Sequence, residues 1–396
     1  MNTGRLIFSQ LMDYLPTHEF NRCVARYRGN HRTRGFGCRD QFLVMAFAQL
    51  TYRESLRDIE TCLRSRGRQL YHAGIRGRVA RSTLADANER RDWRIWADVA
   101  AVLIERARRL YADQTLGVDL QQTVYAFDST TIDLCLALFP WARFRRRKSA
   151  VKLHTLIDLR GNIPCFVHVS SGRMADVTSL DLLPIEPGSF YVMDRGYTDF
   201  QRLYRFTQAG AFFITRTKRN LDFAYREHHA VDKATGLRSD TLIRLWGPKS
   251  SRCYPALLRR IHYYAQDIHR RFVFLTNNFT VEALVIAELY RSRWQVELFF
   301  KWVKQNLRIK TFFGVSPNAV KTQVWIAVCV YVLVAIIKKE LAIERSMAEI
   351  LQILSISLFD KTPLLQAFLN LGAETEMDGC SNQLSLFDFT AVPNNS

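Results

Sequence analysis

The stretch VYAFDS at residues 124–129, echoed by YVMDRG at residues 191–196, decides the fold of this chain. Each is an apolar, β-prone run that carries one aspartate, Asp128 or Asp194, at its carboxyl end, followed by polar or turn residues. If the two strands are parallel neighbours, the two carboxylates meet at the edge where open α/β sheets usually carry their sites. Turns also favour aspartate, so neither residue alone indicates chemistry.

Strand and helix patterns around these segments predict a mixed α/β core. We expect strands at 123–127, 131–136, 151–158, 163–169, 190–193, 211–215 and 272–276. Helices are expected near 177–183 and 199–208, and a long helix begins near Val281. A polar stretch with turn residues, from about residue 219 to 270, predicts an insertion before that last helix.

The residues before about 115 form a different region, which is helical in pattern and uses arginine without lysine. Helices are expected over 41–50, from Leu56 with Ser55 as N-cap, from Ser82, and over 93–110. A small helical module with a basic surface suits the reading of DNA ends. A solvated arginine-rich face on a structural bundle explains the same pattern, and this segment alone does not separate the two.

The third carboxylate of interest lies in the segment YRSRWQVELFFKWVK at 290–304. At about 100° per residue, five polar side chains fall within an arc of about 80° on one helix face. They are Tyr290, Arg293, Glu297, Lys301 and Lys304. The other faces are apolar, so a largely buried helix is expected, and charges are costly to bury without partners. An ordinary i,i+4 ladder is the alternative, but we favour a functional face.

Composition restricts the partner. The chain has 396 residues, with 56 Lys+Arg against 37 Asp+Glu, a net charge of +19 and 48% hydrophobic residues. This excludes disordered and low-complexity classes and indicates a polyanionic partner. The eight cysteines include no C-x-x-C pair, so neither a zinc ribbon nor a disulfide scaffold is expected. The apolar run 324–337 is too short to span a membrane and is predicted to be a buried helix.

The spacing Tyr290-x2-Arg293-x3-Glu297-x6-Lys304 is a Y-R-E-K signature, and it follows FDST at 127–130 and MDRGY at 193–197. With these motifs the chain resembles the DDE transposases of bacterial insertion sequences, most closely the large group named after insertion sequence number four. The resemblance covers most of the chain. It implies an α/β fold with an RNase H-like mixed-sheet core, a β-rich insertion and flanking helical regions.

The resemblance also implies a mechanism. Asp128, Asp194 and Glu297 would hold two divalent metals, normally Mg²⁺, with Mn²⁺ as an alternative. One metal would activate a water or a DNA 3′-hydroxyl, and the other would stabilise the leaving oxygen of an in-line phosphoryl transfer. The same site would cut at the element's ends and join the freed 3′-hydroxyls to target DNA. Tyr290, Arg293, Lys301 and Lys304 would grip phosphates close to the scissile bond.

Other basic residues are candidate DNA contacts. Lys152 and His154 lie in a strand expected beside Asp128, although packing at the edge of the core is the alternative. The run from Arg143 to Lys148 is a candidate backbone clamp or a solvated loop; its candidate contacts are Arg145, Arg146 and Arg147. Better-known relatives stack a tryptophan of the insertion on a flipped base during hairpin formation. The position of Trp246 does not assign it that role, so the cleavage intermediate stays open.

These patterns predict a domain organisation. We expect a helical DNA-binding region at 1–115, a first core part at 121–218, a β-rich insertion at 219–270 and the last core strand with the Glu-bearing helix at 271–310. A C-terminal helical region at 311–375 and a disordered tail at 376–396 follow. In the tail, Gln383, Leu384, Ser385, Leu386 and Phe387 are similar to the peptide that docks on the bacterial sliding clamp, or they pack on the core.

The predicted function is therefore cut-and-paste DNA transposition by a metal-dependent enzyme. Its partner is double-stranded DNA, both the terminal inverted repeats and the target, bound by a homodimer. We expect a soluble protein, cytoplasmic and associated with the nucleoid, with no membrane partner. Two alternatives remain: an RNase H-like nuclease or resolvase that does not join strands, and a basic DNA-binding protein without catalysis, whose binding would depend on salt but not on metal.

Overall fold

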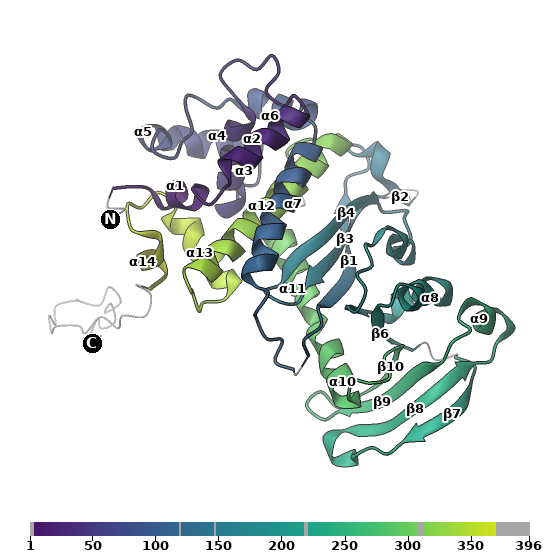
Figure 1. The fold of residues 1–396 in the computed structure, drawn as a ribbon. Coiled ribbons are helices and arrows are strands. Elements are labelled where there is room, and N and C mark those ends of the chain that lie inside the picture. The colour runs from purple at the N-terminus through teal and green to yellow at the C-terminus, as the bar shows by residue number, and fades with distance from the viewer. Residues whose placement is uncertain (1–3, 119, 146–147, 218–220, 307–311, 370–396) are drawn as a thin grey trace, which may run out of the picture.

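A mixed β-sheet runs through the centre of the molecule (Figure 1). The computed structural model describes residues 4–118, 120–145, 148–217, 221–306 and 312–369. Within them the sheet has ten strands: β1 (Val124–Leu134), β2 (Arg143–Arg145), β3 (Lys148–Asp158), β4 (Ile163–Ser171), β5 (Phe190–Met193), β6 (Phe212–Arg216), β7 (Phe223–His229), β8 (Leu237–Leu245), β9 (Leu258–Ala265) and β10 (Arg270–Thr276). The predicted mixed α/β core is confirmed.

The strands follow the order β2-β3-β1-β5-β6-β10-β9-β8-β7, with β4 also paired to β3. β5 runs parallel to both β1 and β6, whereas every other pairing is antiparallel. Two expected strands, 123–127 and 131–136, prove to be one. β1 continues without a break to Leu134, because β3 pairs with it from Tyr125 onward. The expectation that a strand ends at Asp128 is therefore wrong.

Seven helices precede the sheet among the described residues: α1 (Ile7–Met12), α2 (Thr17–Arg26), α3 (Cys38–Leu50), α4 (Leu56–Ser65), α5 (Gly67–Leu70), α6 (Arg81–Arg90) and α7 (Arg94–Leu110). The predicted helical N-terminal region is confirmed. The Ser55 side chain caps α4, since it accepts a 3.1 Å hydrogen bond from the Asp58 backbone N–H. Shorter elements follow along the chain: η1 (Pro140–Ala142), η2 (Asp176–Leu182), η3 (Arg195–Tyr197), α8 (Phe200–Gln208), η4 (Lys233–Thr235) and α9 (Pro248–Cys253).

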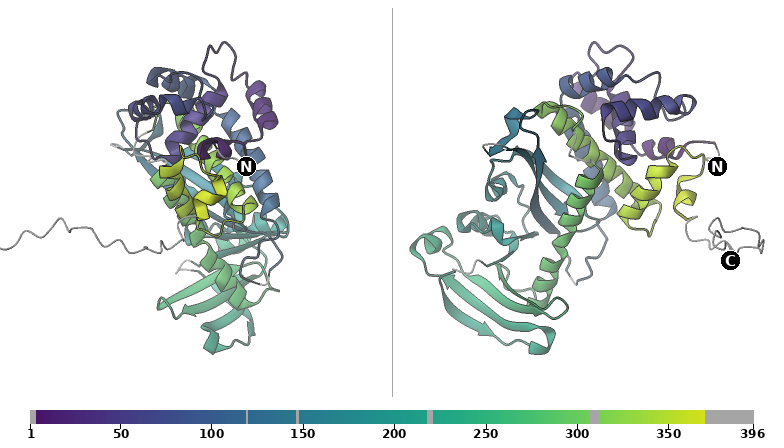
Figure 2. Two further views of the ribbon diagram at one scale, coloured as in Figure 1. Left: turned by 90° about the vertical axis from the view of Figure 1, so that its left-hand side faces the viewer. Right: turned by 180° about the vertical axis from the view of Figure 1, so that it is seen from behind.

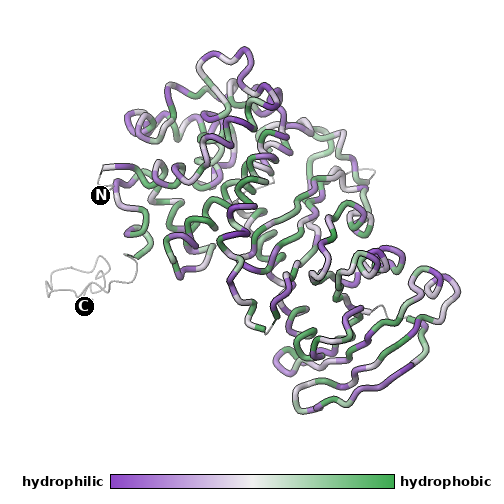
Figure 3. The backbone as a smooth tube through the Cα atoms, viewed as in Figure 1, coloured by the Kyte–Doolittle hydropathy of each residue, from purple (hydrophilic) through white to green (hydrophobic). Residues whose placement is uncertain are grey.

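Helix α12 (Pro317–Glu340) is the long apolar helix of the fold, followed by α13 (Met347–Ser357) and α14 (Leu364–Leu369). It packs against α7, α3, α6, α13 and β4, and Figure 3 shows apolar residues gathered along it and along the central strands. By length and composition its 24 residues could cross a membrane, but 89% of its most apolar window is buried inside the protein. The run 324–337 therefore belongs to a longer helix than expected, and the prediction that it is a buried helix is confirmed.

The stretch predicted as an insertion contains strands β7, β8 and β9. They do not form a separate sheet, because β9 pairs with β10 and the other two follow in series. The result is an arm that carries the central sheet away from the helical region (Figures 1 and 2). At its base, Arg259 donates two hydrogen bonds of 2.9 and 2.7 Å to Asp240, and both side chains are buried.

The helix that bears Glu297 differs from the expectation. Instead of one long helix there are two, α10 (Ala283–Ser292) and α11 (Trp294–Asn306), which meet at Arg293. The Arg293 N–H bonds to the Tyr290 carbonyl and the Val296 N–H to the Arg293 carbonyl, so the chain tightens to three-residue spacing there. Nor is α11 buried on most sides, since Trp294 and Leu298 are 50% and 46% exposed.

Candidate active site

The two aspartates lie side by side for a reason set by strand pairing. β1 and β5 pair in parallel as far as Phe127 and Met193, and Asp128 and Asp194 are the next residues on each strand. The pairing with β5 ends there, while β1 continues in its pairing with β3. The two carboxylates therefore come together at the edge of β5, although only Asp194 follows a strand end.

Asp128 has both of its carboxylate oxygens engaged. Oδ1 accepts a 2.8 Å hydrogen bond from the Ser129 backbone N–H, and Oδ2 accepts one of 2.8 Å from Arg293 Nη1. Burial raises the pKa of Asp128 above its ordinary value, and the nearby charges of Asp194 and Glu297 raise it further. The Ser129 N–H and the Arg293 charge oppose that rise without cancelling it.

Asp194 has a different environment, built by the neighbouring strand β6. Arg216 donates hydrogen bonds of 3.1 and 2.6 Å to Asp194 Oδ1, and the Tyr290 hydroxyl donates one of 3.2 Å to the same oxygen. Burial acts to raise the pKa of Asp194, but the Arg195 backbone N–H and the Arg216 side chain outweigh it, so the pKa is lowered. The two aspartates thus have pKa values shifted in opposite directions.

Glu297 joins the aspartates from the first turn of α11. Its Oε1 accepts a 2.5 Å hydrogen bond from Arg293 Nη2, while Nη1 of the same guanidinium bonds Asp128. Tyr290 and Arg293 also lie together, since the Arg293 guanidinium carbon is 5.9 Å from the centre of the Tyr290 ring. The structure therefore brings together five predicted residues: Asp128, Asp194, Tyr290, Arg293 and Glu297.

Two other members of the signature face, Lys301 and Lys304, are exposed and point elsewhere. They line a cleft of about 1320 Å³ between α11, β1 and α13, which Gln295 and Lys338 also line. Nothing in their hydrogen bonds or ion pairs ties either lysine to the carboxylates within the described part of the chain. They are placed to meet a ligand that extends beyond the acid cluster.

Lys152 and His154 do lie on β3 beside β1, but their side chains leave the site. Register explains why: Asp128 pairs with Thr155, so the residues one and three places earlier project from the opposite face. Lys152 Nζ is 3.0 Å from Asp176 and donates to the Met174 carbonyl at 2.9 Å. His154 is fully buried, bonds Ser170 at 2.9 Å, and burial lowers its pKa to about 4. This geometry favours the packing alternative for both residues.

The remaining predicted contacts fall at or beyond the limits of the described structure. Arg145 ends β2, and its side chain is not among those described. Arg146 and Arg147 lie outside the described residues, as do Gln383, Leu384, Ser385, Leu386 and Phe387.

A cationic pocket beside Asp194 was missed by the sequence reasoning. It has a volume of about 390 Å³, and four arginines line it: Arg195, Arg216, Arg260 and Arg271. Phe223 and Phe272 supply aromatic walls, and Arg260 stands 5.2 Å from the centre of the Phe223 ring. Arg216 ends a strand parallel to β5, so the strand-end reasoning that found Asp194 could also have found it.

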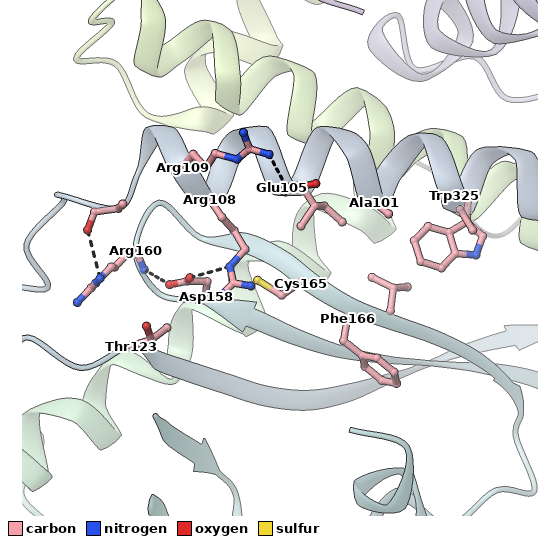
Figure 4. A pocket seen from close by; sticks show the side chains of 14 residues that line it. Ala101, Glu105, Arg108, Arg109, Thr123, Asp158, Arg160, Cys165, Phe166 and Trp325 are labelled. Atoms are coloured by element: carbon pink, nitrogen blue, oxygen red, sulfur yellow. Dashed lines mark hydrogen bonds and ion pairs between the residues drawn. The ribbon is translucent and has the colours of Figure 1, made fainter. Parts of the chain in front are cut away.

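A cavity of about 620 Å³ between α7 and β4 is separate from this site (Figure 4). Arg108 lines it, 3.5 Å from Asp158 and 3.4 Å from Glu186, and Trp325 lines it as well. The lining includes neither the aspartates nor Glu297, so the cavity is no part of the acid cluster.

The chemistry of the acid cluster suits a divalent cation. Three carboxylates supply oxygen ligands, which Mg²⁺ prefers. Burial, with a smaller effect of the Asp194 and Glu297 charges, raises the pKa of Asp128, and a cation would offset both. Across the described ranges, however, no three His, Cys, Asp or Glu side chains already converge in metal-binding geometry. At this cluster, the Arg293 guanidinium bonds two of the three acids.

Comparison with known proteins identifies the family of the chain. A family described as Transposase DDE domain matches residues 119–333, and a domain of unknown function, DUF4372, matches residues 3–76. A protein of Sinorhizobium fredii described as transposase y4zB is 31% identical over 257 residues, which are 64% of this chain and 70% of that protein.

Two further relatives have similar descriptions. A Geobacillus stearothermophilus protein described as a transposase for insertion sequence element IS5377 is 31% identical over 208 residues, 52% of this chain and 54% of its own length. A Synechocystis protein described as a transposase for insertion sequence element IS4SA is 24% identical over 322 residues, 78% and 83% of the two chains.

The mixed sheet flanked by helical regions agrees with the predicted α/β fold class. The chain belongs to the DDE transposase family, whose matched segment includes both aspartates and Glu297. The predicted class, an enzyme of DNA transposition, is thereby confirmed, and dependence on divalent metal comes with the family.

Proposed function

We propose that Asp128, Asp194 and Glu297 are the catalytic carboxylates of this transposase, and that each site holds two Mg²⁺ ions, with Mn²⁺ as a substitute. The single observation that carries the proposal is that these three acids meet, although they are separated by up to 169 residues of sequence. Arg293 bonds both Asp128 and Glu297, and Asp194 lies beside Asp128 on the neighbouring strand. Bound cations supply Lewis acidity for phosphoryl transfer at DNA ends and for joining to target DNA.

The chain's own residues would prepare the DNA. Arg293 and Tyr290 stand among the carboxylates, so they are placed to orient the scissile phosphate through hydrogen bonds. Lys301 and Lys304, which face the adjoining cleft, would contact the backbone further along the strand. The arginines of the pocket beside Asp194 would bind phosphates on the side of the β7–β9 arm.

The wider assignments stay proposals. Residues 1–115 would read DNA ends, 121–218 and 271–310 would form the two parts of the core, 219–270 the insertion and 311–375 the C-terminal helical region. We place the chain in the insertion-sequence-four group, acting as a homodimer on inverted repeats in the bacterial cytoplasm, at the nucleoid. Docking of residues 383–387 on the sliding clamp is tested by pull-down, with Leu386→Ala and Phe387→Ala as controls; no binding by the intact tail would end that proposal.

Cleavage of a duplex that carries the element's terminal repeat, with and without Mg²⁺, tests the catalytic assignment. We expect Asp128→Ala, Asp194→Ala and Glu297→Ala each to lower the rate at least about a thousandfold, while binding of the duplex changes little. Glu344→Ala is the matched control, because Glu344 is exposed and lies outside the acid cluster. Variants that lose DNA binding but keep chemistry would refute the assignment.

A further inference from the structure

Arg293 occupies an unusual position for a residue expected to hold DNA. Its guanidinium lies between two of the proposed metal ligands, with Nη1 on Asp128 Oδ2 and Nη2 on Glu297 Oε1. Its side chain is 16% exposed, and its Nε is buried without a hydrogen-bond partner in the described structure. A guanidinium and a divalent cation both bind carboxylate oxygens, so the two would compete for the same atoms.

We propose that Arg293 competes with the divalent cation for Asp128 and Glu297, and that a phosphate of substrate DNA ends the competition by drawing Arg293 away. This inference rests on the proposed function, because it takes the three carboxylates to be the cation ligands. It adds a coupling between the two ligands: the protein binds cation weakly without DNA and strongly with it.

The bonds at Asp128 show where Arg293 and a cation would compete. Ser129 N–H takes one carboxylate oxygen and Arg293 takes the other, so neither oxygen is clear of a donor. Asp194 is arranged differently, because Arg216 and Tyr290 direct all three of their hydrogen bonds to Oδ1. Arg216 therefore holds Asp194 without taking its second oxygen, whereas Arg293 occupies the one Asp128 oxygen that the Ser129 N–H does not bond.

A DNA phosphate is a better partner for Arg293 than the pair it now bridges. Guanidinium binds phosphate through two parallel hydrogen bonds, and the unsatisfied Nε of Arg293 would become one of those donors. The bond to Glu297 is the weaker half of the bridge, because the Glu297 side chain is 57% exposed and its attraction is screened by water. Movement of one side chain then releases two carboxylates together.

The coupling has a thermodynamic consequence. If DNA frees the cation ligands, the cation must tighten DNA binding by the same factor that DNA tightens cation binding. In protein that is not bound to a DNA end, Arg293 would remain bonded to Asp128 and Glu297. The cation site would form only after a DNA phosphate binds Arg293.

Binding of Mn²⁺ to the full-length protein, followed by calorimetry and by electron paramagnetic resonance, tests this inference without any cleavage reaction. Without DNA, we expect Arg293→Ala to bind Mn²⁺ at least about tenfold more tightly than the unaltered protein. Arg216→Ala is the matched comparison, because it removes an equal charge from the same acid cluster without freeing an oxygen of Asp128. Its effect should be clearly smaller than that of Arg293→Ala. Equal effects of the two variants would overturn the inference, since charge alone would then explain both.

A second measurement uses a duplex that carries the element's end. It should tighten Mn²⁺ binding by the unaltered protein at least about tenfold, and should have a smaller effect on Arg293→Ala, whose ligands are already free. Arg293→Lys keeps the positive charge and is a control for misfolding of the alanine variant. Because an ammonium lacks the planar fork that spans two carboxylates, the Mn²⁺ affinity of Arg293→Lys should lie between those of the unaltered protein and Arg293→Ala. An equal increase in Mn²⁺ affinity on DNA binding in all three proteins would overturn the proposed competition. Failure of the DNA-bound unaltered protein to take up Mn²⁺ would instead defeat the proposed function.

Discussion

Arg216 and Asp194 are joined by two hydrogen bonds, of 2.6 and 3.1 Å, that end on the same carboxylate oxygen. They lie at the carboxyl ends of neighbouring parallel strands, so the backbone itself sets their separation. Arg216 is therefore a positioning residue: it fixes the direction of the Asp194 carboxylate and lowers its pKa.

Replacing Arg216 with alanine should slow cleavage by about 10- to 100-fold, because hydrogen bonds to a charged group are worth about 1.5–3 kcal/mol. Without Arg216, burial should raise the pKa of Asp194 toward that of Asp128, so that both aspartates shape the acid side of the pH–rate profile and that side moves to higher pH. Arg205→Ala is the control, since Arg205 pairs with Asp181 on the exposed side of α8. A lower rate with an unmoved pH profile would show that Arg216 acts in some other way.

The opposed pKa shifts of the aspartates predict a direction for pH dependence. Asp128 must be ionised to hold a cation, and its raised pKa means that protons compete with the cation at a pH above the usual aspartate range near 4. On acidification, Mn²⁺ binding should therefore be lost through protonation of Asp128 before Asp194 titrates. Calorimetric titrations with Mn²⁺ at a series of pH values measure this. Because the Asp194 charge helps to raise the pKa of Asp128, an Asp194→Asn variant should keep an acid limb that is displaced to lower pH. An acid limb removed by Asp194→Asn would contradict the prediction.

The same shifts have opposite effects on stability. The lowered pKa of Asp194 contributes stability above the unfolded-state value near 4, and that contribution is lost as pH falls through the folded-state pKa. The raised pKa of Asp128 makes its ionised form a cost to stability at neutral pH. The cost shrinks as pH falls through the folded-state pKa and is gone below the unfolded-state value near 4. Thermal unfolding of Asp194→Asn and Asp128→Asn across pH values should show slopes that differ from the unaltered protein in opposite directions.

The arm formed by β7, β8 and β9 should depend on the buried pair of Arg259 and Asp240. Arg259 also donates a 2.5 Å hydrogen bond to the Val281 carbonyl, which ties the arm to the residues before α10. Arg259→Ala leaves a buried carboxylate unpaired, at a cost of about 3–5 kcal/mol. Limited proteolysis should then cut within 221–269 faster than in the unaltered protein. Arg238→Ala, on the exposed side of β8, should not change the rate, and removing Asp240 as well should recover part of the loss.

The turn between β3 and β4 requires glycine at position 161. Gly161 has φ of +76°, and a Cβ there would lie 2.2 Å from the Tyr111 ring, which is buried after α7. Gly161→Ala should lower stability by about 1–3 kcal/mol more than Gly188→Ala, which has φ of +78° but open space around its Cβ. Melting temperatures of the two variants give the comparison; equal losses would mean that backbone strain alone is responsible.

Local sequence patterns predicted much of the fold. Alternation and apolar runs placed β3, β4, β5, β6 and β10 within a few residues, and Ser55 marked the start of α4 because a serine cap acts on its own turn. The continuity of β1 could not be read the same way, because it comes from pairing with β3, a partner distant in sequence. The break at Arg293 was also hidden, since the local pattern there is that of one uninterrupted helix.

The candidate site was likewise predictable only where local spacing or strand ends determine it. Spacing on one helix face placed Arg293 and Glu297 together, and strand-end reasoning placed Asp128 beside Asp194. That reasoning gave no information on which face of β3 would hold Lys152 and His154, because face depends on register with β1. The arginine pocket was missed because its walls come from four separate segments that only the folded sheet brings together.

The uninterrupted course of β1 has a mechanical consequence. At Asp128 the strand is paired with β3 on one side, and its pairing with β5 ends one residue earlier. Moving this aspartate would therefore require breaking strand pairing in the middle of the sheet. Asp194 is fastened in turn by Arg216. Glu297 stands on a helix that begins at a break and has an exposed side chain, so it alone has freedom to travel. If one set of acids serves successive DNA geometries, the Glu297 side chain would move to fit each of them, while the two aspartates stay in place.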